Sequence, residues 1–134
     1  MNLPLSGGCL CSVVRYEITR APIFVYACHC MDCQGSTSSA FSVGVVVPAD
    51  GFQVSGSDNT RLVFGGIAAS NGRVKQRRVC TKCGTWLYGD ERNHAKYTGL
   101  VRIVRSGTFD DQTWISPAAH YWVKRAQHWD RVSR

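Results

Sequence analysis

The spacing of the cysteines constrains this sequence more than any other feature. Seven cysteines occur among 134 residues, and all of them lie in three short clusters: Cys9 and Cys11; Cys28, Cys30 and Cys33; and Cys80 and Cys83. The count is odd, and the first eight residues contain neither a basic start nor a long apolar stretch, so we expect no signal peptide and no disulfide framework. Thiolates one or two residues apart can converge on a single ion, so the clusters predict metal binding.

Seven sulfur ligands divide most simply into a set of four and a set of three. Tetrahedral thiolate coordination favours zinc, with an iron–sulfur cluster as the less favoured alternative. A closed set of four thiolates is typical of a structural site, whereas three protein ligands leave a position open for water or substrate. The only triplet is Cys28, Cys30 and Cys33. We therefore predict that these three residues form the open, catalytic zinc site.

The two remaining pairs would share one structural ion. This arrangement joins Cys9 and Cys11 to Cys80 and Cys83, and closes a loop over the 68 residues between Cys11 and Cys80. The chain would then carry two zinc ions. The alternative is two structural zinc ions, the second completed by a histidine such as His29, although His29 lies between two ligands and would be poorly aimed at the same ion.

Composition and charge weaken several other interpretations. With 44% hydrophobic and 19% charged residues, the sequence is typical of one globular domain, which we place at residues 1–134. No apolar run approaches the roughly 18 residues of a membrane-spanning helix, so we expect no membrane partner. Because no signal peptide is expected either, we expect a cytoplasmic protein. The formal net charge is +7. It falls to about +4 if seven thiolates surround two divalent ions, which weakens the case for nucleic acid as a partner.

Short runs of β-branched and aromatic residues predict a mainly β fold with little helix. Val14, Tyr16 and Ile18 alternate with polar residues, as in a half-buried strand. Asn71-Gly72 predicts a hairpin that returns the chain to Cys80, and the Gly7-Gly8 pair is expected in a turn. Candidate helices lie only at 32–38 and 117–129, and further strands are expected at 23–27, 41–47, 51–55, 61–64, 74–79, 85–88 and 97–104.

The three cysteine motifs, in this order, resemble those of a known enzyme family. They read Gly-Gly-Cys-x-Cys from Gly7, Cys-His-Cys-x-x-Cys-Gln from Cys28 and Cys-x-x-Cys-Gly from Cys80. They are similar to the motifs of the glutathione-dependent formaldehyde-activating enzymes, whose superfamily includes the centromere protein V domain. The resemblance runs from about Ser6 to Trp129, so the core of the domain is expected at about 6–129. It implies a β-tent fold of stacked antiparallel sheets, with structural zinc ligands at Cys9, Cys11, Cys80 and Cys83 and catalytic zinc ligands at Cys28, Cys30 and Cys33.

The resemblance also implies a carbon–sulfur lyase. A thiol such as glutathione would enter the open zinc position, ionise there at neutral pH and add to the carbonyl carbon of an aldehyde such as formaldehyde, giving an S-hydroxyalkyl adduct. His29, Gln34, Ser36 and Trp129 are candidate substrate-binding residues. Hydrogen-bonded support of the metal ligands is the alternative role for His29 and Gln34, and a solvated turn is the alternative for 36–39.

The C-terminal part of the sequence departs from the family pattern. His120, Trp122 and Trp129 resemble a His-x-Trp motif and a later tryptophan of the family. Between them, Lys-Arg-Ala-Gln-His at 124–128 stands where the family has a stretch similar to Ser-Lys-x-Pro. We expect Trp122 to pack in the core, and Trp86 to pack in the core or at an edge.

Two other classes of function remain open from the sequence. One is a non-catalytic zinc module that only captures a thiol, and the other is a basic zinc protein that binds nucleic acid. Arg73, Lys75 and Arg77 alternate along one predicted strand and share a face, which would either bind carboxylates or phosphates or remain solvated. Against nucleic acid, the basic residues are dispersed, and the sequence has no Cys/His zinc-finger spacing with a recognition helix.

Overall fold

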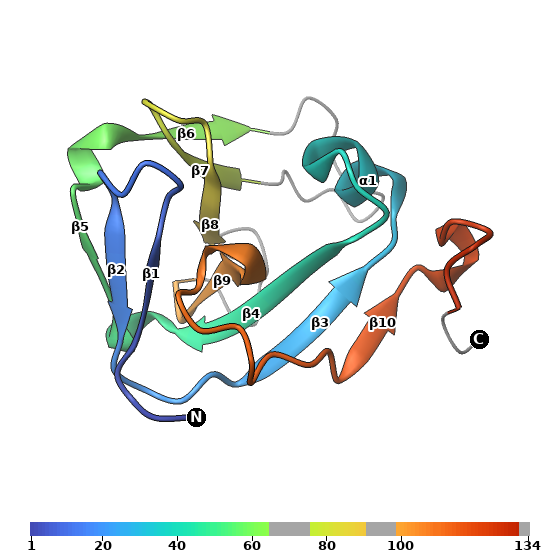
Figure 1. Cartoon of the computed structure of the whole chain (residues 1–134), viewed down its shortest axis with the longest axis horizontal. Coiled ribbons are helices and arrows are strands. Elements are labelled where there is room, and N and C mark those ends of the chain that lie inside the picture. Colours follow the sequence, from blue (N-terminus) through green and yellow to red (C-terminus); the bar gives the residue numbers. More distant parts are fainter. Residues whose placement is uncertain (65–75, 91–98, 132–134) are drawn as a thin grey trace.

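Ten strands in two sheets dominate the part of the chain that the computed structural model describes, residues 1–64, 76–90 and 99–131. The smaller sheet is antiparallel and has the order β1-β2-β5. It consists of β1 (Leu5–Gly8), β2 (Arg15–Ile18) and β5 (Phe52–Ser55). In Figure 1 these three strands stand together on the left, in blue and green.

The larger sheet has the order β10-β3-β4-β9-β8-β7-β6. Its pairs are antiparallel except for β10 with β3, which is parallel and departs from the expected antiparallel arrangement. This edge strand comes from the C-terminal part of the chain, which leaves β9 and crosses to the far side of β3 (Figure 1). The seven strands are β3 (Phe24–Cys28), β4 (Ser42–Pro48), β6 (Thr60–Phe64), β7 (Gln76–Cys80), β8 (Trp86–Asp90), β9 (Val101–Arg105) and β10 (Ala119–Tyr121).

The predicted strands form close to their expected positions, with two corrections. Gly7 and Gly8 lie in β1 and not in a turn. A Cβ on Gly7 would overlap the carbonyl oxygen of Thr108 and the hydroxyl of Tyr16, so this strand needs glycine for close approach. Residues 99 and 100 form a turn, so β9 begins only at Val101. The predicted Asn71-Gly72 hairpin lies outside the described residues.

Helical structure is limited, as expected, but only one of the two candidate helices forms. The prediction at 32–38 is confirmed by α1 (Met31–Thr37). The prediction at 117–129 is wrong, because the backbone there bonds to neighbouring elements: Ala118 N–H donates to the carbonyl of Val25, and β10 pairs with β3. In the described ranges, no helix has the length and apolar character needed to cross a bilayer. Short 3-10 helices complete the fold: η1 (Ala49–Gly51), η2 (Ser57–Asn59), η3 (Ser106–Thr108) and η4 (Val123–Arg125).

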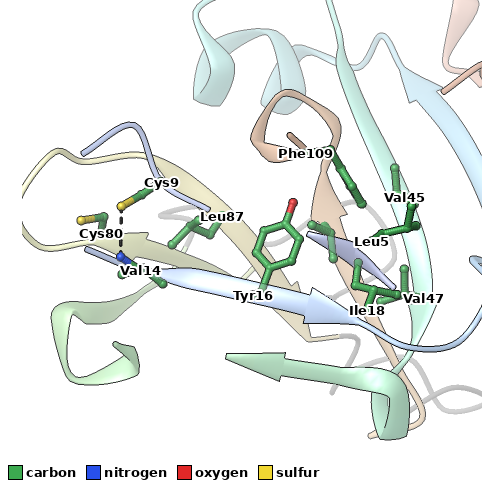
Figure 2. Packing of buried hydrophobic residues seen from close by; sticks show 11 residues of the cluster. Leu5, Cys9, Val14, Tyr16, Ile18, Val45, Val47, Cys80, Leu87 and Phe109 are labelled. Carbon is green, nitrogen blue, oxygen red and sulfur yellow. Dashed lines mark hydrogen bonds between the residues drawn. The ribbon is translucent and has the colours of Figure 1, made fainter. Parts of the chain in front are cut away.

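The hydrophobic core lies between the two sheets. Ile18 of β2 and Val45 and Val47 of β4 are completely buried and meet across the interface (Figure 2). Each such side chain contributes roughly 1.5–3 kcal/mol when removed from water. Cys9 and Cys80 belong to the same cluster, at its end beside Leu87. One cysteine cluster is therefore continuous with the hydrophobic core.

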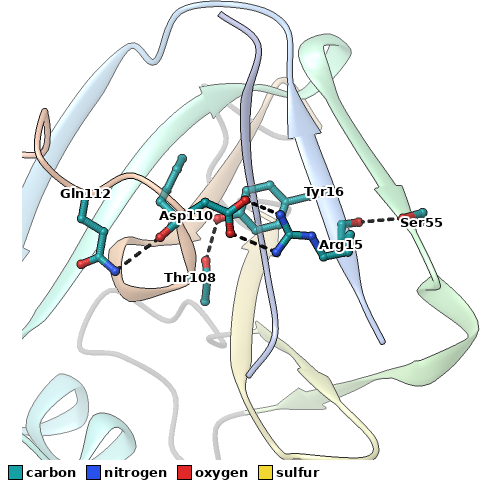
Figure 3. A network of polar contacts seen from close by, with 7 residues as sticks. Arg15, Tyr16, Ser55, Thr108, Asp110 and Gln112 are labelled. Carbon is teal, nitrogen blue, oxygen red and sulfur yellow. Dashed lines mark hydrogen bonds and ion pairs between the residues drawn. The ribbon is translucent and has the colours of Figure 1, made fainter. Parts of the chain in front are cut away.

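A polar network connects the small sheet to the segment after β9. Arg15 pairs with the carboxylate of Asp110, and the Tyr16 hydroxyl lies 2.7 Å from the hydroxyl of Thr108 (Figure 3). The Thr108 hydroxyl in turn donates to the carbonyl of Arg105 at 2.7 Å. Burial raises the pKa of Tyr16 above its ordinary value, so this phenol stays neutral. The network fixes the end of β9 and the residues that follow it.

Candidate metal centres

The four-cysteine cluster is assembled by two tight connections. Cys9 and Cys11 lie between β1 and β2, where Cys9 N–H donates to the carbonyl of Val14 at 3.0 Å. Cys80 ends β7 and Cys83 lies before β8, as the sequence predicted for this pair. Gly84 follows with φ of 78°, and its N–H donates to the carbonyl of Cys80 at 3.0 Å. A residue with a side chain would be strained at this φ, which explains the glycine after the last cysteine.

The sulfur separations in this cluster match a tetrahedral zinc site. The four Sγ atoms all lie within 4.8 Å of one another, with 3.6 Å between Cys9 and Cys11 and 3.8 Å between Cys11 and Cys80. Sulfurs at about 2.3 Å from a tetrahedral zinc ion are separated by about 3.8 Å, so the residues present fit this ion. The cysteines are free thiols, not disulfides.

Hydrogen bonds to sulfur favour the thiolate form in this cluster. Val14 N–H donates to Cys9 Sγ at 3.3 Å, and the N–H of Cys83 donates to Cys80 Sγ at 3.5 Å. Hydrogen bonds from the hydroxyl and backbone of Thr85 lower the pKa of Cys83 to about 5. The backbone of Val13 favours the Cys11 thiolate, but desolvation and the neighbouring thiols together raise the pKa of Cys11 to about 11. Four crowded sulfurs do not all ionise without a compensating cation, which is consistent with a divalent ion.

The three-cysteine cluster lies where β3 meets α1. Cys28 ends β3 and is buried, Cys30 is the N-cap of α1, and Cys33 is buried in the first turn of that helix. The three Sγ atoms lie within 4.8 Å of one another. Cys33 N–H donates to Cys30 Sγ at 3.3 Å, and the hydrogen bond with Cys33, together with burial, raises the pKa of the Cys28 thiol. Among the described residues, no fourth Cys, His, Asp or Glu joins this group.

His29 is turned away from the three sulfurs, toward the C-terminal segment (residues 119–131). Its ring is completely buried. Nε2 lies 3.1 Å from Nδ1 of His120, and Nδ1 lies 3.7 Å from Oδ2 of Asp130. Both ring nitrogens therefore face this segment. This orientation does not support the alternative in which His29 completes a second closed zinc site.

Gln34 also contacts the C-terminal segment. Its amide nitrogen donates to the carbonyls of His29 at 2.8 Å and Arg125 at 2.7 Å, and its amide oxygen accepts from Gln127 at 2.7 Å. The backbone N–H of His29 donates to the carbonyl of Tyr121 at 2.9 Å. The structure thus places Gln34 in the role of connecting α1 to this segment.

The two tryptophans of the C-terminal segment are exposed. Trp122, expected in the core, is 58% exposed and has a left-handed backbone with φ of 58°. The prediction of core packing is wrong for this residue, because β10 is an edge strand and ends at the preceding residue. Trp129, a candidate substrate-binding residue, is 61% exposed.

Ser36 lines a cleft of about 880 Å³ between α1 and the four-cysteine cluster. Ser42, Trp86 and Arg105 also line this cleft. No sequence motif indicates a role for Ser42 or Arg105, and the sequence predicts only packing for Trp86. These three residues come together through the pairing of β4 with β3 and β9 and through a register shift between β7 and β8. No short sequence motif indicates these strand pairs or the register shift.

Arg77 lies beside these residues. It is half-buried, with its guanidinium 5.1 Å from the centre of the Trp86 ring, so the solvated-face interpretation is wrong for this member of the basic row. Arg73 and Lys75 lie outside the described residues. The Arg105 guanidinium lies 4.4 Å from the centre of the same ring. Both distances are typical of cation–π contacts.

Comparison with known proteins identifies the family. A family model described as glutathione-dependent formaldehyde-activating enzyme matches residues 4–125. The chain belongs to this family. The match covers both cysteine clusters, all of α1 and strands β1 to β10.

Several fungal proteins are similar to this chain over most of its length. Relatives from Phaeosphaeria nodorum and Fusarium vanettenii are each 31% identical, over 111 and 117 residues that make up 81% and 84% of the chain. A protein from Talaromyces marneffei is 27% identical over 111 residues. Each of the three is named "putative glutathione-dependent formaldehyde-activating enzyme". The matched part of the chain covers only 55–60% of the length of these relatives.

Proposed function

We propose that this protein is a zinc-dependent carbon–sulfur lyase that binds a small thiol, such as glutathione, at the three-cysteine cluster. Its reaction would form or cleave an S-hydroxyalkyl adduct between that thiol and an aldehyde such as formaldehyde. One observation carries the proposal: of the two cysteine clusters, one has four sulfurs and the other has three, with no further ligand among the described residues. The family supports the choice of thiol and aldehyde.

The two clusters would have different roles. Cys9, Cys11, Cys80 and Cys83 would hold a structural zinc ion, and Cys28, Cys30 and Cys33 a catalytic one. A zinc ion held by three thiolates would stabilise the ionised form of an incoming thiol at neutral pH. Seven thiols require a reducing compartment, so we assign the protein to the cytoplasm. We also treat residues 1–134 as one domain.

The chain's own residues would hold the reacting groups and exclude water. In the forward direction the thiol sulfur bonds to the carbonyl carbon, and the proton of the thiol ends on the former carbonyl oxygen. Cys28 and Cys33 are buried, so one side of the site is closed to solvent. The N–H of Cys33 stabilises charge on the Cys30 sulfur. His29 and Gln34 hold the C-terminal segment beside these ligands.

A turnover measurement tests the proposal. Glutathione and formaldehyde combine spontaneously, so the readout is the exchange rate between free glutathione and its S-hydroxymethyl adduct, followed by NMR. We expect zinc-loaded protein to accelerate this exchange and Cys30→Ser to abolish the acceleration. Exchange at the spontaneous rate with the loaded wild type, together with saturable thiol binding, would instead support a non-catalytic thiol-capture module.

A further inference from the structure

The C-terminal segment lies at the edge of the larger sheet, next to the three-cysteine cluster. Its β10 pairs with β3, and this pairing places Tyr121 opposite Cys28 (Figure 1). Residues 119–131 include no buried residue, and none of them belongs to the hydrophobic core or packs against it. Trp122 and Trp129 are exposed. Beyond Tyr121, the place of this segment on the fold is therefore set mainly by polar contacts.

Two side chains of the segment contact residues beside the predicted zinc ligands. Gln127 Nε2 donates to Oε1 of Gln34 at 2.7 Å, and Asp130 Oδ2 lies 3.7 Å from Nδ1 of His29. The His29 ring is completely buried and the Asp130 side chain is only 17% exposed, so water screens this pair weakly. Both Gln127 and Asp130 lie after residues 4–125, which the family model matches. Their contacts are therefore features of this chain and lie outside the matched family pattern.

The amide of Gln34 has only one satisfactory orientation in this arrangement. Its Nε2 donates to two carbonyls, those of His29 at 2.8 Å and Arg125 at 2.7 Å. Exchanging the amide nitrogen and oxygen would place an oxygen against both carbonyls, so Oε1 faces Gln127. Gln127 thus donates to a side chain that itself connects the carbonyl of His29 to α1.

Both contacted residues are direct neighbours of predicted zinc ligands. His29 lies between Cys28 and Cys30, and Gln34 follows Cys33. Neighbouring side chains on a strand end or a helical turn project in different directions. The sulfurs gather on one side of this stretch, and the contacts of His29 and Gln34 with the C-terminal segment lie on the other. Fixing His29 and Gln34 therefore fixes the backbone from which all three sulfurs project.

The metal and the C-terminal segment would act on the same stretch of backbone. Three thiolates bind one ion only when their sulfurs are held close together, and sulfurs within 4.8 Å of one another are compatible with a single zinc ion. Contacts that order this stretch in advance lower the entropy that metal binding costs. Because coupling between two binding events is reciprocal, bound metal would strengthen docking of the segment by the same factor.

We propose that Gln127 and Asp130 are positioning residues of the three-cysteine cluster, and that metal binding at this cluster is coupled to docking of the C-terminal segment. The two residues act through Gln34 and His29, and neither belongs to the cluster as a ligand. The inference rests on one part of the proposed function, the zinc ion at the three-cysteine cluster, and does not depend on the reaction.

Competition between the zinc-loaded full chain and a chromophoric chelator measures the effect on metal affinity. Two metals per chain are first confirmed, and the release step that is missing in Cys30→Ser identifies the three-cysteine cluster. Loss of a group that holds a metal ligand typically lowers metal affinity by about 10–100-fold. We expect this loss in Asp130→Ala and in Gln127→Glu, which keeps the shape of the side chain but removes the donor to Gln34. Lys124→Ala, at an exposed residue of the same segment, is the matched control and should release zinc like the wild type.

The four-cysteine cluster is an internal control in every variant. A positioning role predicts that affinity falls at the three-cysteine cluster alone, with the other release step unchanged. A general loss of stability would weaken both steps. Equal weakening of both steps, or wild-type affinity at the three-cysteine cluster in Gln127→Glu and Asp130→Ala, would overturn the inference.

Hydrogen exchange tests the reciprocal effect without any substitution in the segment. The amides of Ala126 and Asp130 donate to carbonyls within the segment at 3.1 and 2.9 Å, so their exchange reports its order. We expect both amides to exchange at least about tenfold faster in zinc-saturated Cys30→Ser than in the zinc-saturated wild type. Serine is a favoured N-cap residue, so this variant preserves the start of α1. Equal exchange in the two proteins would refute the coupling.

The two proposals fail in different ways. If the wild type accelerates exchange between glutathione and its adduct, but its zinc affinity does not depend on Gln127 or Asp130, the coupling is refuted and the proposed function stands. Zinc affinity that depends on these residues, without acceleration of that exchange, would support the coupling and count against the lyase.

Discussion

Cys83→Ser tests whether the four-cysteine cluster holds the fold together. The cluster joins the β1–β2 connection to the β7–β8 connection, and 68 residues lie between Cys11 and Cys80. If the metal acts as a cross-link, releasing a loop of this length costs about 4 kcal/mol, a large part of the roughly 5–15 kcal/mol of a typical domain. The new hydroxyl keeps Thr85 as a hydrogen-bond partner, so the loss reports the metal cross-link and not an unpaired polar group.

Cys30→Ser is the matched control for that experiment. It removes a ligand from the three-cysteine cluster, where the cross-linked stretch from Cys28 to Cys33 is short, and the same relation gives at most about 2 kcal/mol. Serine is also a favoured N-cap residue, so the start of α1 is preserved. Each variant removes one thiol, but the stability lost in Cys83→Ser is expected to be about twice that lost in Cys30→Ser, or more.

Thermal unfolding by circular dichroism, with metal counted per chain on the same samples, measures both effects. We expect Cys83→Ser to lose one metal and to lower Tm by roughly 12 °C or more, because 1 kcal/mol corresponds to about 3–4 °C for a chain of this size. Cys30→Ser should also lose one metal but lower Tm by less than half as much. Equal losses of Tm, or a Cys83→Ser variant as stable as the wild type, would refute the assignment of a structural ion to this cluster.

Three further predictions concern the framework around the sites. Asp110→Asn should lower the free energy of unfolding at pH 7 by about 0.2–1 kcal/mol in urea titrations, because the partner of Arg15 is lost. Arg15 lowers the pKa of Asp110. The difference in free energy of unfolding between wild type and variant should therefore persist above the ordinary aspartate pKa of about 3.9 and disappear as pH falls through the lowered value. A difference that grows in acid would contradict this prediction. A Cβ at Gly44 would lie 2.7–2.8 Å from neighbouring side chains, so Gly44→Val should lower the free energy of unfolding by about 1–3 kcal/mol. Gly107 has open space around it, so Gly107→Ala should change the free energy of unfolding by less than about 0.5 kcal/mol. Gln34→Leu should speed hydrogen exchange in the C-terminal segment, and unchanged exchange would show that its three hydrogen bonds do not hold the segment.

The two cysteine clusters were predictable from the sequence mainly because the residues that form them are close together along the chain. Cys28, Cys30 and Cys33 are close in sequence, so a strand end and one helical turn are enough to bring their sulfurs together. Cys9 and Cys11 are far in sequence from Cys80 and Cys83. Seven thiols divide most simply into four and three, however, and this division leaves the two pairs to form one cluster. The strands were also predictable, because side-chain alternation is a property of each strand alone.

Features set by neighbouring elements were not predictable in the same way. The segment at 117–129 has no convincing 3.6-residue apolar period, and within it Ala119–Tyr121 form β10 by pairing with the edge of β3. Gly7 and Gly8 are typical of turns, yet they lie in β1 because they pair with Tyr16 and Arg15 of β2. Thr108 and Tyr16 approach Gly7, and Val14 and Arg15 approach Gly8, too closely for a Cβ. Arg105 entered no motif, since its place beside Trp86 depends on the pairing of β9 with both β4 and β8.

We propose that one cluster is closed by four thiolates and that the other is open, with three. The visible spectrum of the cobalt-substituted protein distinguishes these two kinds of site when it is recorded during a glutathione titration, after two metals per chain have been confirmed. We predict a saturable shift toward a spectrum with more thiolate ligands, present in the wild type and absent in Cys30→Ser. A spectrum that stays fixed through the titration of a fully loaded wild type would contradict an open three-cysteine site that takes this thiol.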